Sequence, residues 1–375
     1  MRELVYQGKG KVDWREVPMP ELRAPDDALV RPLAASRCDG DCAYLHYPLP
    51  GILKAGNALH VFDPASRDFA ATPFAIGHEC VGEIVALGDG VKGFAVGERV
   101  IVPWSISCGS CENCRLGLTS KCRGVHPGRV LSGYGFGECL GGFGGMVSDL
   151  IRVPHAMGTL VAAPEGIDST VLAPASDNIP DAWRTVAPML AKYPGAPVLV
   201  VGGGAKSIGL YAVGIAKALG ASNIDYLDDC RVRLGIAERL GGQPVVLDKR
   251  SRWYRSGQPP GKIRPLITVD ASAQISGLQY AIRVLAPGGH CTCVGFHFLK
   301  GTPVPLFQMY LNSSTLHVGV SHPRAVLPEV LDLIRRGSFH PEWVSTLIAD
   351  WEEAPQAYLE KTTKLVLRRD SCVGG

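Results

Sequence analysis

The sequence predicts an α/β protein with two parts, one rich in β-strands and one built on a doubly wound parallel sheet. Three observations indicate this fold class. Short apolar runs alternate with Gly and Pro up to about residue 102, strands and helices alternate regularly from about residue 197, and the 375-residue chain is long enough for two or three domains. Repeated strand–helix units build a parallel sheet that is covered by helices on both faces.

The composition is that of an ordinary globular protein and argues against several classes of function. Hydrophobic residues make up 46% of the chain, charged residues 19%, and the formal net charge is only +3. Such a balance gives no electrostatic footprint for nucleic acid or for a membrane surface. The N-terminal residues 1–4 are not followed by the apolar stretch of a secretory signal, and no apolar segment is long enough to span a bilayer. We therefore expect a cytoplasmic protein.

The first part is predicted to consist of short strands separated by turns. The runs at 28–33, 81–88 and 97–102 are rich in Val, Ile and Leu and are bounded by Gly or Pro, which is typical of strands. A further strand is predicted over residues 146–153. Residues 45–75 interrupt this pattern with apolar, Pro-rich sequence. This segment is long for a connection, so it is either functional or partly ordered on its own.

The second part alternates strands and helices. Its predicted strands and helices are 198–201, 208–219, 223–227, 231–240, 245–247, 266–269, 291–294 and 315–318. A helical pattern over 169–191 precedes it, and a helix at about 324–336 and a strand at 363–367 follow it as a return to the first part. We therefore assign residues 1–178 and 321–375 to one domain and residues 179–320 to the other.

Four of the twelve cysteines lie within fifteen residues, at Cys108, Cys111, Cys114 and Cys122. In a large intracellular chain such a cluster indicates metal binding, whereas disulfides would need an oxidising compartment. Two-residue gaps let successive thiolates converge on one ion, and four thiolates close a tetrahedron. No position is left for substrate, so we predict a structural zinc that holds a lobe at about residues 104–124.

A Gly-rich turn joins the strand at 198–201 to the helix that follows and predicts a dinucleotide-binding loop. The backbone N–H groups of such a turn and the N-terminus of the helix receive a pyrophosphate. The turn departs from the G-x-G-x-x-G pattern, since Ser207 stands where the third glycine belongs and Gly209 follows two residues later. Lys206 either contacts a phosphate or is an ordinary exposed loop lysine. The residues expected at the cofactor are Gly202, Gly204, Lys206, Ser207, Ile208 and Gly209.

The next predicted strand leads to Asp228, the position where an acidic residue would accept hydrogen bonds from the adenosine ribose. A carboxylate at this position repels the 2′-phosphate of NADP, so the sequence favours NAD(H) over NADP(H). Arg231 and Arg233 lie close by and act against that preference. We also expect Arg233 to contact the cofactor.

Cys38, His78 and Asp177 are far apart in the sequence and are predicted to bind one catalytic zinc. A thiolate, an imidazole and a carboxylate are all zinc ligands, and three protein ligands leave the fourth tetrahedral position for substrate or water. Each residue taken alone has a simpler explanation. A buried Cys or His usually belongs to the core, and Asp177 precedes a helix, where Asp is a favoured N-cap. The residues by themselves leave both explanations open.

Together these residues make the chain resemble the zinc-dependent medium-chain alcohol dehydrogenases along nearly its whole length. The resemblance rests on the segments 38–41, 77–82 and 97–100, on the four cysteines and on the loop at 202–209. It implies a GroES-like β-rich catalytic domain and a Rossmann NAD-binding domain. It also implies two zinc ions per subunit, one catalytic and one structural.

The resemblance further implies roles for residues around the catalytic zinc. Asp177 would be the third ligand, as in the formaldehyde-dehydrogenase-like branch of the family. Glu79 would be a carboxylate behind the ligands that is able to approach the metal during ligand exchange, and Asp41 would orient the histidine ligand. Trp104 would form an aromatic wall of the substrate pocket, and the alternative is that it is simply part of the core.

Two features depart from the family pattern. Gly40 stands where a Ser or Thr hydroxyl usually passes the substrate proton outward, so the proton would leave through ordered water, Asp39 or His46. The segment 45–75 is longer than is usual in the family and is expected to face the substrate. These departures leave the substrate identity open.

The function that the resemblance implies is reversible hydride transfer between an alcohol and NAD(H), giving an aldehyde or ketone, with zinc as the Lewis acid. Two alternatives remain. One is a zinc-free double-bond reductase of the same fold, which the three zinc ligands argue against. The other is a non-enzymatic nucleotide-binding structural or regulatory protein, which would bind NADH without turnover. We expect a small-molecule substrate, no nucleic-acid or membrane partner, and a homodimer or tetramer that pairs through the edge strand near 315–320.

Overall fold

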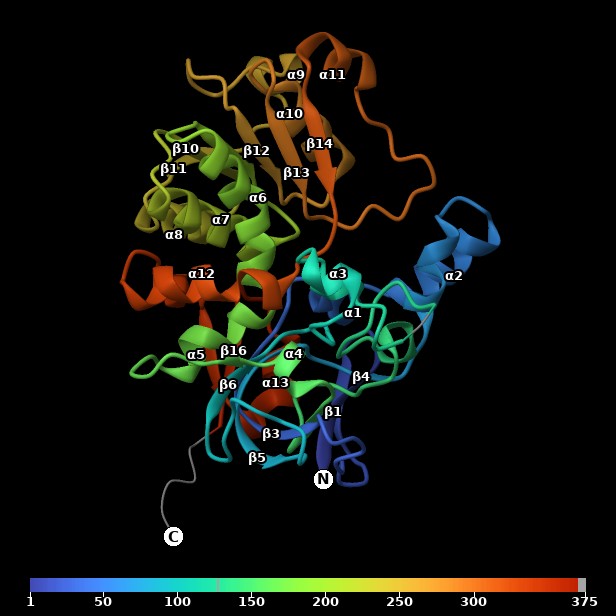
Figure 1. The fold of residues 1–375 in the computed structure, drawn as a ribbon. Helices are drawn as coiled ribbons and strands as arrows, with labels where there is room; N and C mark the ends of the chain where they lie inside the picture. The colour runs from blue at the N-terminus through green and yellow to red at the C-terminus, as the bar shows by residue number, and fades with distance from the viewer. Residues whose placement is uncertain (127, 370–375) are drawn as a thin grey trace. The chain divides into compact units, whose positions relative to one another are not determined.

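The computed structural model describes residues 1–126 and 128–369, and its chain separates into two compact units (Figure 1). The first unit contains Met1–Pro180, Ser321–Leu331 and the described chain from Ser345 onward. The second unit contains Asp181–Val320 and Asp332–Val344. None of the helices in the described residues is long and apolar enough to cross a membrane.

The first unit is built on two mainly antiparallel sheets. One has the strand order β2-β1-β4, and the other has the order β15-β16-β3-β5-β6-β8, with β7 paired to β3. Among the described strands of this unit, only β15 and β16 are parallel neighbours. The strands are β1 Arg2–Gly8, β2 Lys11–Glu16, β3 Ala28–Ser36, β4 Phe74–Ala75, β5 Glu79–Leu87, β6 Arg99–Val102, β7 Ile151–Val153, β8 Val161–Ala162, β15 Leu347–Asp350 and β16 Leu365–Arg368.

Short helices connect these strands. They are α1 Asp41–His46, α2 Leu49–Ala58, α3 Glu112–Arg115, α4 Ala156–Thr159, α5 Ser169–Leu172 and α13 Ala354–Leu359. The 3-10 turns of the chain are η1 Pro64–Ser66, η2 Asp68–Ala70, η3 Thr119–Lys121, η4 Gly137–Leu140, η5 Ala173–Ser176, η6 Pro341–Val344 and η7 Trp351–Glu353. The segment 45–75 therefore has structure of its own, because α2, η1 and η2 occupy much of it.

The strand predicted at 146–153 is shorter in the structure, because only β7 at its C-terminal end forms regular pairs, with β3. The residues before β7 change partners along the chain. The N–H of Met146 donates to Gly77 (2.8 Å), and the carbonyl of Val147 accepts from Leu4 (2.8 Å). Two partners within two residues satisfy the backbone without a continuous ladder, so the prediction was wrong in length.

The second unit is a six-stranded parallel sheet with the order β11-β10-β9-β12-β13-β14. The eight predicted strands and helices are found here with boundaries displaced by at most two residues, whereas three shorter helices, α9, α10 and α11, were not predicted. The elements are β9 Val198–Val201, α7 Lys206–Ala218, β10 Ile224–Asp228, α8 Arg231–Arg239, β11 Gln243–Val246, α9 Arg252–Ser256, β12 Ile267–Asp270, α10 Ile275–Arg283, β13 His290–Cys293, α11 Leu306–Asn312 and β14 Thr315–Val318. Two longer helices, α6 Asn178–Lys192 and α12 Pro323–Arg335, contain points where the chain passes from one unit to the other.

Candidate functional site

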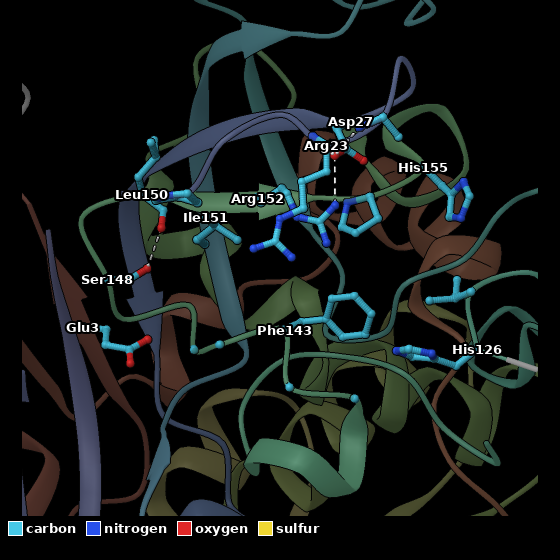
Figure 2. A pocket seen from close by; sticks show the side chains of 18 of the residues that line it. Glu3, Arg23, Asp27, His126, Phe143, Ser148, Leu150, Ile151, Arg152 and His155 are labelled. Carbon is cyan, nitrogen blue, oxygen red and sulfur yellow. Dashed lines mark hydrogen bonds and ion pairs between the residues drawn. The ribbon is translucent and has the colours of Figure 1, made fainter. Parts of the chain in front are cut away.

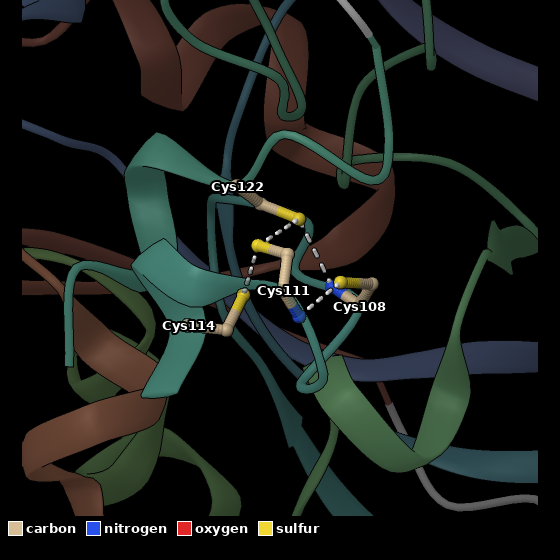
Figure 3. Close-up of side chains that lie close together, drawn as sticks. All are labelled: Cys108, Cys111, Cys114 and Cys122. Carbon is tan, nitrogen blue, oxygen red and sulfur yellow. Dashed lines mark hydrogen bonds between the residues drawn. The ribbon is translucent and has the colours of Figure 1, made fainter. Parts of the chain in front are cut away.

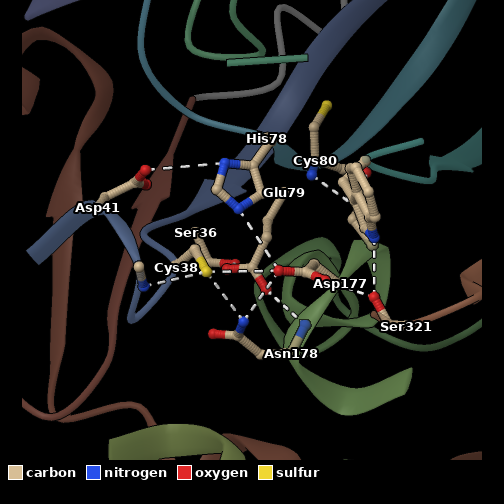
Figure 4. A network of polar contacts seen from close by, with 12 residues as sticks. Ser36, Cys38, Asp41, His78, Glu79, Cys80, Asp177, Asn178 and Ser321 are labelled. Carbon is tan, nitrogen blue, oxygen red and sulfur yellow. Dashed lines mark hydrogen bonds and ion pairs between the residues drawn. The ribbon is translucent and has the colours of Figure 1, made fainter. Parts of the chain in front are cut away.

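Strand pairing brings two of the three predicted zinc ligands to one sheet edge. In the antiparallel pair β3–β5, Ser36 at the end of β3 lies opposite Glu79 at the start of β5. Cys38 follows β3 by two residues and His78 directly precedes β5, so both lie just beyond the same edge. Asp177 comes from the junction of η5 and α6, and Figure 4 shows its side chain pointing toward the other two.

The three side chains face one another at the spacing of metal ligands. Cys38 Sγ lies 3.3 Å from Asp177 Oδ2, and His78 Nε2 lies 3.4 Å from the same oxygen. In a tetrahedral zinc site, ligand atoms about 2.0–2.3 Å from the ion lie roughly 3.3–3.5 Å from one another. The thiolate, imidazole and carboxylate present here therefore fit zinc in both geometry and chemistry.

The burial and the mutual electrostatic interactions of the three residues favour a bound cation. Cys38 and His78 are buried, and the Asp177 side chain is 15% exposed. Burial, with Asp177 as a further cause, raises the pKa of the Cys38 thiol well above its usual value. Burial lowers the pKa of His78, but the Asp41 and Asp177 carboxylates outweigh this effect and raise that pKa to about 9. A divalent ion at this position would be held by the deprotonated thiol, the neutral imidazole and the carboxylate, and its charge would favour those protonation states.

Asp41 lies behind the histidine, as the sequence resemblance implies. Its Oδ1 is 3.7 Å from His78 Nδ1, the ring nitrogen that faces away from the other ligands. Gly77 before the histidine has a φ of +94°, and a Cβ there would lie 2.7 Å from the Val147 side chain and 2.9 Å from the Tyr358 hydroxyl. Only glycine fits this close approach, so Gly77 fixes how the chain enters the site.

A buried polar network that the sequence did not reveal supports the ligands. The side-chain amide of Asn178 donates to Cys38 Sγ and to Asp177 Oδ2, both at 3.1 Å. Its oxygen accepts from the Lys364 ammonium (2.7 Å), which also pairs with Glu79. The Glu79 carboxylate also accepts hydrogen bonds from the backbone N–H of Asn178 (2.9 Å) and from the buried hydroxyl of Ser36 (2.8 Å).

The buried ion pair links the ligands to the C-terminal strand. Lys364 directly precedes β16, lies 285 positions after Glu79 in the sequence, and is 1% exposed. Burial lowers the pKa of Lys364, but the Glu79 carboxylate outweighs this effect and raises it. The lysine is therefore charged, and it holds the Asn178 amide with its N–H₂ group toward Cys38 and Asp177.

Trp104 is linked to Asp177 by two hydrogen bonds through the Ser321 hydroxyl. Its indole N–H donates to the Ser321 hydroxyl (2.8 Å), and that hydroxyl donates to Asp177 Oδ1 (2.8 Å). Trp104 is only 7% exposed. The residue is thus tied to the carboxylate through Ser321, another contact that sequence reasoning missed, and its role as a pocket wall stays a prediction.

The four clustered cysteines form a second metal candidate in the first unit (Figure 3). Cys111 Sγ lies 3.5 Å from Cys114 Sγ and 3.9 Å from Cys122 Sγ, far beyond a disulfide bond and close to the roughly 3.8 Å edge of a zinc–thiolate tetrahedron. Backbone N–H groups point at the sulfurs, from Cys111 to Cys108 (3.3 Å) and from Gly124 to Cys122 (3.3 Å). Burial raises the pKa of Cys111, but hydrogen bonds from the backbone N–H groups of Cys114 and Arg123 outweigh this effect and lower that pKa to about 6. The spacing of the four sulfurs therefore fits one bound cation.

Replacing one of these thiols is expected to open the lobe. We expect Cys114→Ser to lose one equivalent of zinc and to make the chain near residues 104–124 sensitive to limited proteolysis, because structural zinc provides folding free energy directly. Cys139→Ser is the matched control, since Cys139 donates to the Phe136 carbonyl and lies outside the group. Zinc analysis and mass spectrometry of the fragments measure both effects. Equal zinc content in the two variants would contradict the assignment.

The Gly-rich turn of the second unit follows β9 and leads into α7, as predicted. A Cβ at Gly203, whose φ is +148°, would lie 2.9 Å from the backbone of Ser272, and one at Gly204 would lie 2.8 Å from the Ala273 side chain. Gly209 brings α7 against the sheet, since a Cβ there would meet Ala271 at 3.1 Å. Ser207 and Ile208 are buried on the first turn of α7, and Lys206 begins it. The turn thus leads directly into the N-terminus of a 13-residue helix.

Asp228 ends β10 next to this turn, and its carboxylate is fully engaged. It accepts from Arg233 Nε (2.7 Å) and Nη2 (2.6 Å), from the Tyr226 hydroxyl (2.8 Å) and from the N–H of Cys230 (2.9 Å). These four donors outweigh burial and lower the pKa of Asp228. A Cβ at Gly202 would lie 2.5 Å from this carboxylate. Asp228 and Arg233 therefore form one unit beside the turn, and a ribose hydroxyl would have to replace one of the four donors.

A separate cavity of about 470 Å³ in the first unit does not contain the metal candidates (Figure 2). One of its two buried acids, Asp27, is engaged by the protein: Oδ2 accepts from Arg152 (2.9 Å) and from the N–H groups of Arg23 (2.8 Å) and Ala24 (3.1 Å). The charge pair at this cavity therefore fastens the chain before β3 to β7, and the cavity is not the chemical centre.

Two family models match the chain in the order of its two units. The model of the alcohol dehydrogenase GroES-like domain matches residues 24–165, and that of the zinc-binding dehydrogenase domain matches residues 207–336. A probable zinc-binding alcohol dehydrogenase of Mycobacterium tuberculosis is 28% identical over 359 residues, which are 96% of this chain and 84% of the relative. The glutathione-independent formaldehyde dehydrogenase of Pseudomonas aeruginosa is 29% identical over 66% of this chain and 59% of its own length.

Solved structures show the same fold. The alcohol dehydrogenase TADH from Thermus sp. ATN1 superposes with a TM-score of 0.82 at 27% identity, covering 98% of this chain and 100% of that one. The benzyl alcohol dehydrogenase of Acinetobacter calcoaceticus has a TM-score of 0.78 at 20% identity, covering 98% and 99%, and shows the fold alone. These matches confirm the predicted fold class, a GroES-like β-rich part with a Rossmann-type parallel sheet.

Proposed function

Because this chain belongs to the zinc-binding medium-chain alcohol dehydrogenase family, we propose that it transfers a hydride reversibly between an alcohol and NAD(H), with one catalytic and one structural zinc. The observation that carries this proposal is the convergence of Cys38, His78 and Asp177 from three distant segments at ligand spacing. Three protein ligands leave one coordination position open, which is the arrangement of a catalytic rather than a structural zinc.

Each residue of the site has a defined task in this reaction. Zinc, when bound, supplies a Lewis acid that favours the deprotonated form of an alcohol. Asp177 and Cys38 contribute two negative charges that balance the ion, and His78 is a neutral ligand oriented by Asp41. The Asn178 amide holds the thiolate and the carboxylate at a fixed separation. The N-terminus of α7 after the turn would hold the pyrophosphate of a nicotinamide cofactor, which would supply the hydride chemistry.

The proposal is tested by metal analysis and steady-state kinetics on the full chain. We expect two zinc ions in the proposed catalytic and structural positions, NAD⁺ reduction with a panel of primary and secondary alcohols, and the reverse reaction with the matching aldehydes and ketones. Reduction of activated double bonds by a protein without zinc at Cys38 would favour a double-bond reductase instead. NADH binding without turnover on any substrate of the panel would favour a regulatory protein.

The acidic residue beside the nucleotide turn is proposed to set the preference for NAD(H). Asp228 opposes a 2′-phosphate by charge, while Arg233 would attract it once the carboxylate is gone. We expect Asp228→Asn to lower the ratio of the NADPH to the NADH dissociation constant about tenfold, or ~1.4 kcal/mol. Nucleotide fluorescence titrations measure the ratio. Asp229→Asn is the control for the loss of a carboxylate near Arg233, because Asp229 is 81% exposed and lies 3.6 Å from the same guanidinium. An unchanged ratio would contradict the role of Asp228.

The second unit carries an unpaired sheet edge that we propose joins two copies of the chain. β14 ends the sheet, and the adjacent helix α11 exposes Phe307 (74%) and Tyr310 (79%), a concentration of apolar surface that is typical of an interface. We expect Val318→Asp on β14 to convert the oligomer to smaller species in light scattering with size exclusion. Val246→Asp is the matched control, since this exposed valine lies on β11 at the opposite edge. Identical masses for both variants and the unchanged protein would exclude the β14 edge.

A further inference from the structure

A third cluster of metal-ligating side chains lies in the second unit, apart from the sites above. Asp270 ends β12, Cys293 ends the neighbouring parallel strand β13, and His297 follows four residues later. The carboxyl ends of adjacent parallel strands lie at one sheet edge, so the topology itself brings the three together. Their donor atoms lie within 4.8 Å of one another.

The three donor atoms repeat the set and spacing of the catalytic-zinc candidates. Cys293 Sγ lies 3.4 Å and His297 Nε2 lies 3.5 Å from the same oxygen, Asp270 Oδ2. A charged hydrogen bond between imidazole and carboxylate contracts to about 2.7–2.9 Å. The observed 3.5 Å is instead the edge expected between two ligands of one ion, roughly 3.3–3.5 Å. His297 Nε2 is also buried and has no hydrogen-bond partner among the described residues, which indicates an absent ligand.

We propose that Asp270, Cys293 and His297 bind a divalent metal ion, with Zn²⁺ as the best match to their sulfur, nitrogen and oxygen donors. On binding, the thiol proton of Cys293 passes to solvent and a metal–sulfur bond forms. The charges of the thiolate and the carboxylate then cancel the two charges of the ion, so that the site is neutral when filled.

The surroundings of the cluster suit a bound ion. Asp270 Oδ1 is held by the backbone N–H of Ser272 (3.1 Å) and by the Ser272 hydroxyl, which leaves Oδ2 turned toward the other two donors. Such contacts behind a ligand fix its orientation. Asp270 and Cys293 are buried, whereas the His297 side chain is 14% exposed and gives the ion a path from solvent.

The cluster is connected to the nucleotide turn by two backbone hydrogen bonds. The carbonyl of Ser272 accepts from Gly204 (3.0 Å), and that of Ala271 accepts from Ala205 (2.9 Å). An ion that fixes Asp270 therefore also fixes the segment against which the turn rests. This connection couples metal occupancy to nucleotide affinity, because a stiffened turn needs less ordering when the pyrophosphate binds.

Zinc analysis of paired variants of the full-length protein tests the site. We expect Cys293→Ala and His297→Gln each to contain one zinc equivalent less than the unchanged protein. Cys291→Ala is the matched control, since Cys291 is a buried cysteine of the same strand but lies outside the cluster, and it should retain the full count. We also expect the dissociation constant for NADH to rise roughly fivefold or more in His297→Gln and not in Cys291→Ala.

The result that overturns the proposal is an equal zinc count in the unchanged protein, Cys293→Ala and His297→Gln. His297→Gln decides the matter if Cys293→Ala fails to fold, because the histidine lies at the partly exposed side of the cluster. This test measures whether variants altered only in the second unit contain one zinc equivalent less than the unchanged protein. Its failure would therefore leave the metal candidates of the first unit, and the proposed function, untouched.

Discussion

Replacing Asp177 with serine is expected to abolish zinc binding at the catalytic position, whereas replacing it with cysteine is expected to preserve binding. Serine is a good helix N-cap but a poor zinc ligand, while cysteine is the reverse. If Asp177 is a metal ligand, Asp177→Cys binds zinc more tightly than Asp177→Ser. If Asp177 is only a helix cap, Asp177→Ser is the more stable of the two variants. We expect Asp177→Ser to lose one zinc equivalent and at least about 100-fold in zinc affinity, since even the loss of a residue behind a ligand costs 10–100-fold.

Competition with a chromophoric chelator measures the affinity of each variant, and thermal unfolding measures any effect on α6. Asp181→Ser is the control, because this acid lies in the first turn of the same helix and pairs with Arg184. Asp177→Ser with full zinc content would contradict the ligand role. Full zinc content in both variants, with Asp177→Cys unfolding at a lower temperature than Asp177→Ser, would identify the carboxylate as a cap.

Replacing Lys364 with methionine is expected to destabilise the first unit by about 3–5 kcal/mol, because it leaves the fully buried Glu79 carboxylate without its cation. The Asn178 oxygen also loses its donor. The amide would then be free to turn, and the contacts to Cys38 and Asp177 would weaken. We therefore expect a lower urea midpoint together with weaker zinc binding.

Two further variants distinguish the effect of losing the buried Lys364–Glu79 ion pair from the effect of losing any lysine. Lys361→Met removes an exposed lysine three residues earlier and is expected to change the unfolding free energy by less than about 0.5 kcal/mol. Adding Glu79→Gln to Lys364→Met removes the unpaired charge and should recover much of the lost stability. A change below about 1 kcal/mol in Lys364→Met would show that Glu79 is neutral in the folded protein and that the pair has no ionic character.

Spacing and periodicity were sufficient to predict much of this molecule. The four cysteines are separated by short intervals, so their convergence follows from local chain geometry. The alternation from β9 to β14 is a periodic signal, so the eight elements that were predicted there lie within two residues of their observed boundaries, although the helices α9, α10 and α11 were not predicted. Where the chain changes pairing partners instead of repeating a pattern, as before β7, the prediction failed in length.

The distant supporting residues had no such signal. Lys364 pairs with Glu79 across 285 positions, and Ser321 reaches Asp177 across 144. A lysine before a strand and a serine before a helix are common in any sequence, and they look the same whether exposed or buried. Asn178 is adjacent to Asp177 in the sequence, but its contacts with the candidate ligands depend on Lys364, which fixes the orientation of the Asn178 amide.

The sequence by itself determined which kinds of site and element are present: the two sets of candidate zinc ligands, the glycine turn before a helix, and the order of strands and helices. These follow from residue identity and short-range spacing, which the chain carries before it folds. Only the tertiary structure decided which atoms meet. Ligand spacing at Cys38, His78 and Asp177, the buried Lys364–Asn178–Glu79 network and the Asp270–Cys293–His297 cluster all depend on strand register, which brings distant residues to one sheet edge. Register is set by the packing of the whole domain, and no single segment encodes it.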